Sequence, residues 1–170
     1  KNYVRDNYRR RAMIMANPRF FQTIRDVEIG ERRVTVYGNP FLLEHPDRVV
    51  VRASSKFSDE EKARRRAIAL DTAAHGGVIV SPFINGGEQA LRDECLALGA
   101  RMIRVLWQGF GEKFKPAQRE IELCAQGRLL LVAINPGEPG KETLHKWMAM
   151  EMNRVAESLC DYTQPGRWRR

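Results

Sequence analysis

The turn at Asn85-Gly86-Gly87-Glu88 carries residue types that can bind a phosphate group. It follows an apolar run and precedes a short amphipathic segment, and a second apolar run then ends at Leu106. Consecutive glycines let backbone N–H groups approach an anion closely, and the start of a helix adds unpaired N–H groups and a partial positive charge. The spacing is neither G-x-G-x-x-G nor a P-loop. The turn therefore indicates anion binding without specifying the anion.

Glu88 admits two interpretations. A carboxylate beside a phosphate-binding turn can act as an acid–base group or as a ribose ligand. An acidic residue in the first turn of a helix is also stabilised by the helix dipole without any ligand, and we favour this interpretation. His45, His75 and His145 are isolated, and the chain offers no nucleophile–His–Asp set. We therefore predict no catalytic residue, no metal and no cofactor, and favour a protein that is not an enzyme.

The chain has 29 Lys and Arg residues against 21 Asp and Glu, a formal net charge of +8, which favours a polyanionic partner. Part of this excess lies near the ends, in Arg9-Arg10-Arg11 and in residues 167–170. Lys62 and residues 64–66 lie beside three acidic residues, which is typical of an ordinary charged helix face. Together with the glycine turn, the basic clusters favour nucleic acid over a neutral ligand.

Lys113 and Lys115 are stronger candidates for phosphate contacts, because their glycine-flanked loop gives them no reason to be buried. Aromatic side chains near the expected site can offer stacking faces for bases. For two of them, Phe83 and Trp107, we favour packing in the core or in a loop. The full set of stacking candidates is Phe83, Trp107, Phe110 and Phe114.

Strands and helices alternate along the chain, and this alternation predicts the elements that position these residues. Strands are expected at 33–37, 48–52 and 129–134, and on both sides of the glycine turn within 78–106. A helical region is expected at 3–26, with a break or a new helix start at Pro18. Further helices are expected from a capping box at Ser58 and Glu61 to the glycines at 76–77, after the glycine turn, up to Gln126 and at 141–160. Such alternation predicts an α/β fold with right-handed crossovers.

One substantial core is expected for 170 residues. We divide the chain into an N-terminal helical extension (1–30), the α/β domain (31–161) and a basic C-terminal tail (162–170). Cys95, Cys124 and Cys160 show no metal-ligand spacing and are expected to be reduced core residues of a cytoplasmic protein. The apolar run at 129–134 is far shorter than the roughly 18 to 20 residues of a membrane span, so no membrane partner is expected.

Five short segments, in order, resemble motifs of the DNA-processing protein A (DprA/Smf) family. Residues 36–43 are similar to its Y-x-G-N-x-x-L-L segment, and residues 81–106 follow its S-G-x-A-x-G-I-D turn, helix and next strand. The remaining similarities are to the family's G-x-D-x-x-Y-P loop, its G-x-L-L-S-E strand and its R-N-R-I-I-A-x-L-S helix, at residues 109–116, 127–132 and 152–159.

Four places depart from the family pattern. At residues 81–88 the chain retains only the serine, one glycine and an acidic residue of the S-G-x-A-x-G-I-D turn. Ala53-Ser54-Ser55 replaces Gly-Ser-Arg, and we expect Lys56 to supply the missing charge. Arg92 stands at the family's histidine, and Leu131-Val132 stands at its Ser-Glu. The chain thus resembles a divergent member of the family.

The resemblance implies a Rossmann-like three-layer sandwich with a mainly parallel sheet and helices on both faces. It implies a non-catalytic protein that binds single-stranded DNA, loads a RecA-type recombinase during uptake of transforming DNA, and forms a homodimer. The expected contacts to nucleic acid or phosphate come from loops at one edge of the sheet and from the last helix. These residues are Ser54, Ser55, Lys56, Ser81, Asn85, Gly86, Gly87, Glu88, Lys113, Lys115, Asn153 and Arg154.

Two alternatives stay open from the sequence. The first is a Rossmann-like nucleotide-binding protein or a phosphoribohydrolase that cleaves a nucleoside monophosphate, with Glu88 in its site. The second is a module without a ligand, in which Arg154 is a buried partner of Glu88.

Overall fold

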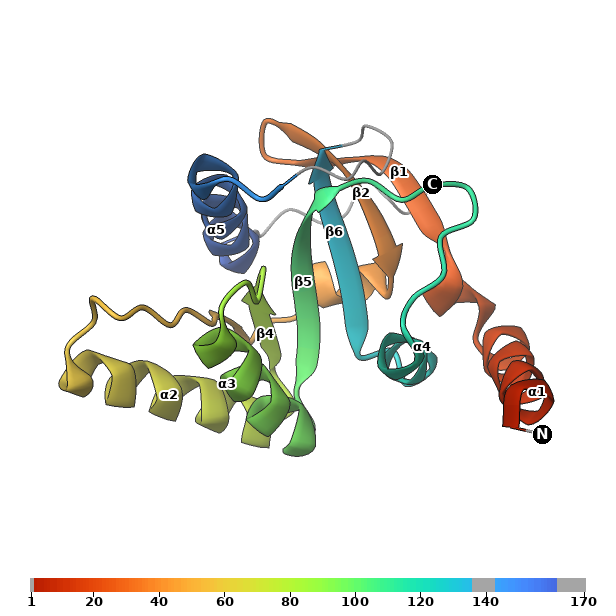
Figure 1. Ribbon diagram of the computed structural model, residues 1–170, viewed down its shortest axis with the longest axis horizontal. Coiled ribbons are helices and arrows are strands. Elements are labelled where there is room, and N and C mark those ends of the chain that lie inside the picture. The colour runs from red at the N-terminus through yellow and green to blue at the C-terminus, as the bar shows by residue number, and fades with distance from the viewer. Residues whose placement is uncertain (1, 136–142, 162–170) are drawn as a thin grey trace.

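In the computed structural model of the chain, which describes residues 2–135 and 143–161, six strands form one sheet in the order β1-β2-β6-β5-β4-β3 (Figure 1). Four of these strands are parallel to one another and run in sequence order across the sheet: β3 (Arg48–Val50), β4 (Val78–Ser81), β5 (Arg101–Gln108) and β6 (Leu129–Asn135). An antiparallel hairpin completes the edge beyond β6, formed by β1 (Thr23–Ile29) and β2 (Arg32–Gly38).

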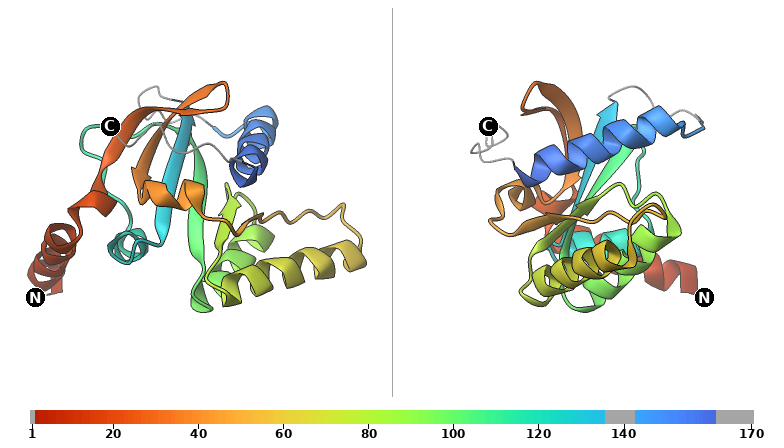
Figure 2. Two further views of the ribbon diagram at one scale, coloured as in Figure 1. Left: turned by 180° about the vertical axis from the view of Figure 1, so that it is seen from behind. Right: turned by 90° about the vertical axis from the view of Figure 1, so that its left-hand side faces the viewer.

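Helices cover both faces of this sheet. Three of them connect successive parallel strands and pack on one face: α2 (Asp59–Ala74), α3 (Gly86–Ala97) and α4 (Gln118–Ala125). The fourth, α5 (Lys146–Cys160), lies across the opposite face, over β3, β4 and β5. Figure 2 shows the resulting layers, with the sheet between α5 and the pair α2 and α3. The predicted Rossmann-like sandwich, mainly parallel and covered on both faces, is confirmed.

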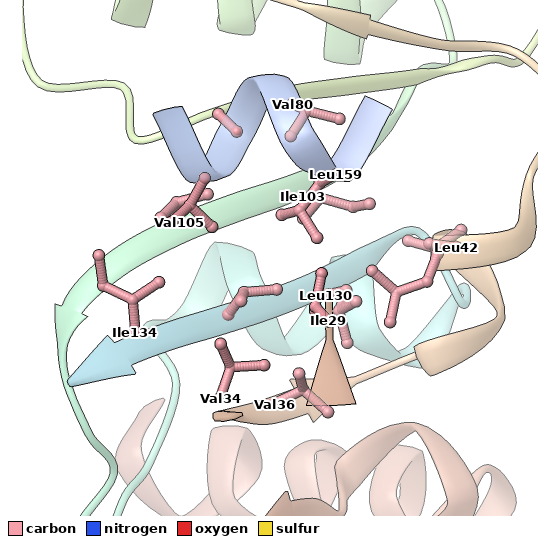
Figure 3. Packing of buried hydrophobic residues seen from close by; sticks show 14 of the residues in the cluster. Ile29, Val34, Val36, Leu42, Val80, Ile103, Val105, Leu130, Ile134 and Leu159 are labelled. Carbon is pink, nitrogen blue, oxygen red and sulfur yellow. The ribbon is translucent and has the colours of Figure 1, made fainter. Parts of the chain in front are cut away.

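The core divides into two halves because alternate strand residues point to opposite faces. Val80, Ile103 and Leu130 face α5, and Figure 3 shows them packed with Leu159 of that helix. Ile79 and other strand residues of opposite parity face α2, α3 and α4. Near-continuous apolar runs are what strands buried on both faces require, and this explains the composition of β4 and β6.

The predicted break at Pro18 is confirmed, but the prediction of helical structure up to residue 26 is wrong at its C-terminal part. Helix α1 (Asn2–Ala16) ends before Pro18, a 3₁₀ turn follows at Pro18–Phe21, and strand β1 begins at Thr23. Val27 and Ile29 are buried in the core, and β1 pairs with β2 through a bulge at Asp26, whose φ is 55°. The predicted domain boundary at residue 30 therefore falls within the turn of a hairpin that belongs to the sheet.

The other predicted elements are close to the observed ones. The Oγ of Ser58 accepts a hydrogen bond from the Glu61 N–H at 3.1 Å and caps α2, as expected. Helix α5 begins at Lys146 and not at residue 141. The expected loop at residues 135–140 and the basic tail at 162–170 lie mostly or wholly outside the described residues. Within the part of the chain that is described, no helix combines the length and apolar character needed to cross a membrane.

Candidate functional site

The loop after β3 and the turn after β4 meet at the carboxyl ends of the parallel strands. Asn85 begins α3 as its N-cap, and its Nδ2 group donates to the carbonyl oxygen of Ala53 at 2.8 Å. The N–H of Ala53 in turn lies 3.4 Å from Oε1 of Glu88. In open α/β sheets this edge is where ligands bind. Two segments that are about thirty residues apart in the sequence are therefore joined into one surface by side-chain hydrogen bonds.

A cleft of about 570 Å³ lies between these two segments. It brings together four of the predicted site residues, Ser54, Ser55, Asn85 and Gly87. It also includes Lys62, which the sequence analysis assigned to an ordinary charged face. In the sequence, the one feature that could have indicated Lys62 as a site residue was its position in the first turns of α2, close after the Ser58 cap. Its ammonium lies 3.6 Å from the carboxylate of Asp59, an acid that is fully exposed, so this pair is weak.

The start of α3 has two N–H groups that no described residue accepts, and one of them, that of Gly87, belongs to a residue that lines the cleft. Asn85 Oδ1 accepts from the Glu88 N–H at 2.9 Å, and this is one half of a capping box. No acceptor within residues 2–135 and 143–161 takes the N–H groups of Gly86 and Gly87. A Cβ atom at Gly87 would lie 3.0 Å from the Cβ of Ala53, so glycine permits the close approach of the two segments there.

Glu88 lies inside the turn. Only 4% of this residue is exposed. Its Oε2 accepts from the N–H groups of Ile84 at 2.9 Å and Asn85 at 3.5 Å, and its Oε1 accepts from Ala53 at 3.4 Å. These bonds agree with the favoured interpretation of Glu88 as an acid at the start of a helix. The bond to Ala53 also links the carboxylate to the loop after β3. A direct contact between Glu88 and a ligand remains a prediction, and the geometry gives the carboxylate a structural role.

Ser81 is fully buried and also supports the turn. Its Oγ accepts from the N–H of Phe83 at 3.1 Å, while Gln89 donates to the Phe83 carbonyl oxygen at 3.1 Å. Phe83 has a φ of 49°, an uncommon conformation for a bulky residue, and its ring is buried in the core. The expected stacking face at Phe83 is therefore covered, in agreement with the core interpretation.

A second cleft, of about 660 Å³, lies at the carboxyl end of β5. Trp107 contacts Trp147 edge to face, with ring centroids 5.0 Å apart, and Trp147 is 60% exposed. The Nε1 atom of Trp107 is buried and has no hydrogen-bond partner among the residues that are described. Phe110 is buried against Tyr37 and Phe114, so the expected stacking face at Phe110 is covered. The cleft is lined mainly by Trp107, Phe110, Lys113, Phe114, Met148 and Met152.

The three predicted lysines are exposed. Lys56, Lys113 and Lys115 form no ion pair with any described residue. Lys113 lines the second cleft, whereas Lys56 follows the cleft residues Ser54 and Ser55 in the loop after β3.

The two predicted residues of α5 differ from each other. Asn153 is half-buried, and its Oδ1 atom has no partner among residues 2–135 and 143–161. The Arg154 side chain is 71% exposed and lies 3.3 Å from Glu151. The pair between Arg154 and Glu88, which the alternative without a ligand included, does not form, because the helix directs Arg154 to solvent while backbone N–H groups satisfy Glu88.

Many other cations have structural partners. Arg64 and Arg65 both bind Glu61, and Arg66 binds Glu94 at 2.6 Å. The cluster at residues 64–66 is thus the ordinary charged face that the sequence predicted.

Arginines at the amino ends of the parallel strands bind backbone carbonyl groups. Arg101 donates to Gly76, and Arg128 donates to Leu96 at 2.7 Å and to Ala100 at 2.8 and 2.9 Å. These acceptors lie at or just after the C-termini of α2 and α3, where carbonyl groups lack helical partners.

The cysteines are free thiols. Cys95 and Cys124 are fully buried, and Cys160 is half-buried. Burial raises the pKa of Cys95 to about 11 and that of Cys124 to about 12, so both are neutral thiols near neutral pH. No group of three metal-ligating side chains occurs in the described part of the chain.

Comparison with known proteins shows similarity at the level of the fold. No family model matches the chain, and no curated protein sequence matches it. A solved structure of DNA processing protein A from Helicobacter pylori, described for its single-stranded DNA binding mode, is similar with a TM-score of 0.53 and 17% identity. The match covers 82% of this chain and 66% of that chain, so this chain spans slightly less than two thirds of its length. The fold is Rossmann-like.

Proposed function

We propose that this protein binds single-stranded DNA at the carboxyl edge of its parallel strands, without catalysing a reaction. The observation that carries the proposal is the first cleft, which gathers hydroxyl and amide donors from the two loop segments and the ammonium group of Lys62 from α2. Ser54, Ser55, Lys62 and the N–H groups of α3 are the donor types that bind phosphate oxygens in nucleic acids. Exposed Lys56 adds a further positive charge beside this cleft.

The second cleft supplies the other requirement for binding a single strand. Sequence-tolerant binding combines cations along the backbone with aromatic faces on which bases stack. The exposed Trp147 provides such a face, in edge-to-face contact with the partly buried Trp107. Trp107 and Lys113 both line this cleft. We therefore propose that phosphates bind near Lys62 and Lys113 and that bases contact the tryptophans.

The similarity to DNA processing protein A supports this ligand, because that protein is described by its binding of single-stranded DNA. We extend the proposal, on the same similarity and on the sequence motifs, to membership of the DprA/Smf family. A role in transformation and recombination, a homodimer, a RecA-type recombinase as partner and a cytoplasmic location are parts of this extended proposal.

The geometry of Glu88 disfavours a phosphoribohydrolase. A catalytic carboxylate must reach its substrate, and the Glu88 oxygens are occupied by backbone N–H groups in a residue that is 4% exposed. The exposed cations beside two clefts likewise disfavour a module that has no ligand.

Fluorescence anisotropy with a labelled oligothymidylate tests the proposal directly. Titrations at two salt concentrations give the salt dependence, and unlabelled duplex DNA and nucleoside phosphates serve as competitors. We expect salt-sensitive binding that duplex DNA displaces weakly. Absence of binding at low salt, or displacement by a free nucleotide alone, would overturn the proposal.

A further inference from the structure

We propose that the Glu88 carboxylate occupies backbone N–H groups that could otherwise bind a phosphate. The site then binds a nucleic-acid polymer in preference to a free phosphate or a mononucleotide. This inference rests on the proposed function, since it specifies the form of ligand that the same edge of the sheet accepts. The region concerned is the amide cradle, which we define as the N–H groups of Ala53, Ile84 and Asn85.

The amide cradle converges on one carboxylate. Ile84 and Asn85 donate to Oε2 at 2.9 and 3.5 Å, and Ala53 donates to Oε1 at 3.4 Å. The donors come from two segments, the loop after β3 and the turn after β4. The reciprocal bond from the Glu88 N–H to Asn85 Oδ1, at 2.9 Å, completes the capping box and fixes the backbone from which the carboxylate extends.

Convergent N–H groups at the start of a helix form the usual environment of a bound phosphate. Here a negatively charged oxygen pair already fills that environment, and the residue that carries it is almost fully buried. A phosphate would have to displace the carboxylate or accept a like charge beside it, and both cost free energy. The amide cradle is therefore unavailable to an incoming anion.

The groups that remain free to bind a ligand lie on the outer side of the turn. Gly86 and Gly87 are exposed, and the Lys62 side chain is 47% exposed. Contacts between phosphate and such solvated groups are individually weak and screened by salt. Useful affinity then requires several phosphates that act together, as in a strand that passes from Lys62 towards Lys113.

Glu88 also acts as a positioning residue. Its bond to the N–H of Ala53 holds the loop that presents Ser54 and Ser55 to the first cleft. Loss of the carboxylate is thus expected to open the amide cradle and to loosen this loop at the same time.

Backbone amide resonances of the ¹⁵N-labelled chain test the inference without any activity assay. Inorganic phosphate and adenosine monophosphate are titrated into the wild-type chain and into Glu88→Ala. In the wild type we expect the resonances of Ala53, Ile84 and Asn85 to stay unchanged. In Glu88→Ala the same three should shift, with an affinity for phosphate about tenfold higher or more, because open donors replace a fixed negative charge.

Glu120→Ala is the matched control. Glu120 occupies the corresponding position of α4, where its Oε2 accepts from one backbone N–H, that of Ala117, at 3.0 Å and its Oε1 accepts from Arg104 at 2.9 Å. Its removal changes the net charge equally and also deletes a cap, but it frees one guanidinium, that of Arg104, and leaves the amide cradle filled by Glu88. We expect no phosphate-dependent shift of the Ala53, Ile84 and Asn85 resonances in this variant.

Phosphate-dependent shifts of the amide cradle in the wild type would overturn the inference, as would their absence in a folded Glu88→Ala chain. If Glu88→Ala does not fold, the wild-type titration decides alone, because a response contradicts a filled cradle and no response supports it. Oligothymidylate binding is measured on the same samples. Its absence would overturn the proposed function, whereas the phosphate response decides the role of Glu88 independently.

Discussion

The two ends of the parallel strands use their positive charges differently. At the amino end, Arg101 and Arg128 bind the carbonyl groups of Gly76, Leu96 and Ala100. At the carboxyl end, cations such as those of Lys56 and Lys113 are exposed and form no ion pair with a described residue. A net charge of +8 therefore combines charges that stabilise the fold with charges that are available to a ligand.

The difference follows from the direction of the helices. A helix that connects two parallel strands begins at the carboxyl end of the first strand and ends at the amino end of the next. Unpaired carbonyl groups therefore gather at the amino end and attract arginines, whereas unpaired N–H groups gather at the carboxyl end and favour anions. Charge at the amino end should thus affect stability, and charge at the carboxyl end should affect binding.

Replacement of Arg128 by Ala should have the largest effect on stability. The guanidinium donates to two backbone carbonyl groups, and charged hydrogen bonds of this kind suggest a loss of about 2 to 3 kcal/mol in the free energy of unfolding. Urea denaturation measures this loss, and Arg128→Lys is expected to lose less. DNA affinity should not change, and a selective loss of affinity in a stable variant would contradict the comparison.

Alkaline pH should destabilise the same end of the molecule through Cys95 and Cys124, which lie in the last turns of α3 and α4. Their pKa values are raised in the folded chain to about 11 and about 12, from an ordinary value of 9.0. The unfolded chain loses these protons first, so stability is complete below pH 9 and falls as the pH rises towards the folded values. At about pH 10 each of the two thiols should lower the free energy of unfolding by about 1.4 kcal/mol relative to its value below pH 9.

Denaturation curves between pH 8 and pH 11 check this expectation. Cys124→Ala should show a smaller decrease in stability over that range than the wild type, whatever its stability at neutral pH. An equal decrease would show that other groups cause the alkaline loss.

Removal of Lys62 and Lys113 together should affect binding and not stability. Each lost contact with a single strand lowers the slope of log affinity against log salt by about 0.7, so the pair should lower it by about 1.4. The free energy of unfolding should change by less than about 0.5 kcal/mol, as is usual for exposed side chains.

Arg66→Ala is the control for Lys62, because Arg66 lies one turn further along α2 and binds Glu94. It removes the same charge and should leave the salt slope almost unchanged. Equal slopes for the wild type and the double variant would exclude both clefts from the binding surface.

Substitution of the two glycines of the turn by alanine should change the stability least, and the two variants should differ from each other. A Cβ atom at Gly86 has open space around it, so Gly86→Ala should stabilise α3 by up to about 0.5 kcal/mol. In Gly87→Ala the new Cβ meets the Cβ of Ala53 at 3.0 Å, which offsets that gain. Thermal unfolding of the two variants measures the difference. A larger stabilisation by Gly87→Ala would show that the two segments move apart readily.

Local signals made the unit from β4 to β5 predictable. Its strands are apolar runs, and Asn85 and Glu88 form the capping box that begins α3. Strand β1 was missed because Arg25 and Asp26 interrupt its alternation, and because its pairing with β2 is what stabilises it as a strand. Glu88 was recognised as a helix-start acid, but its bond to Ala53 depends on how two loops meet.

The sequence by itself determined the alternation of strands and helices, the glycine turn at the carboxyl end of β4 and the excess of positive charge, since each is a property of composition or of short segments. Tertiary structure alone decided which charges are available. Lys62 and Arg66 lie on the same basic stretch of α2, yet one lines a cleft and the other binds Glu94 of α3. Partners so distant in sequence are set by the packing of helices on the sheet, which no local pattern encodes.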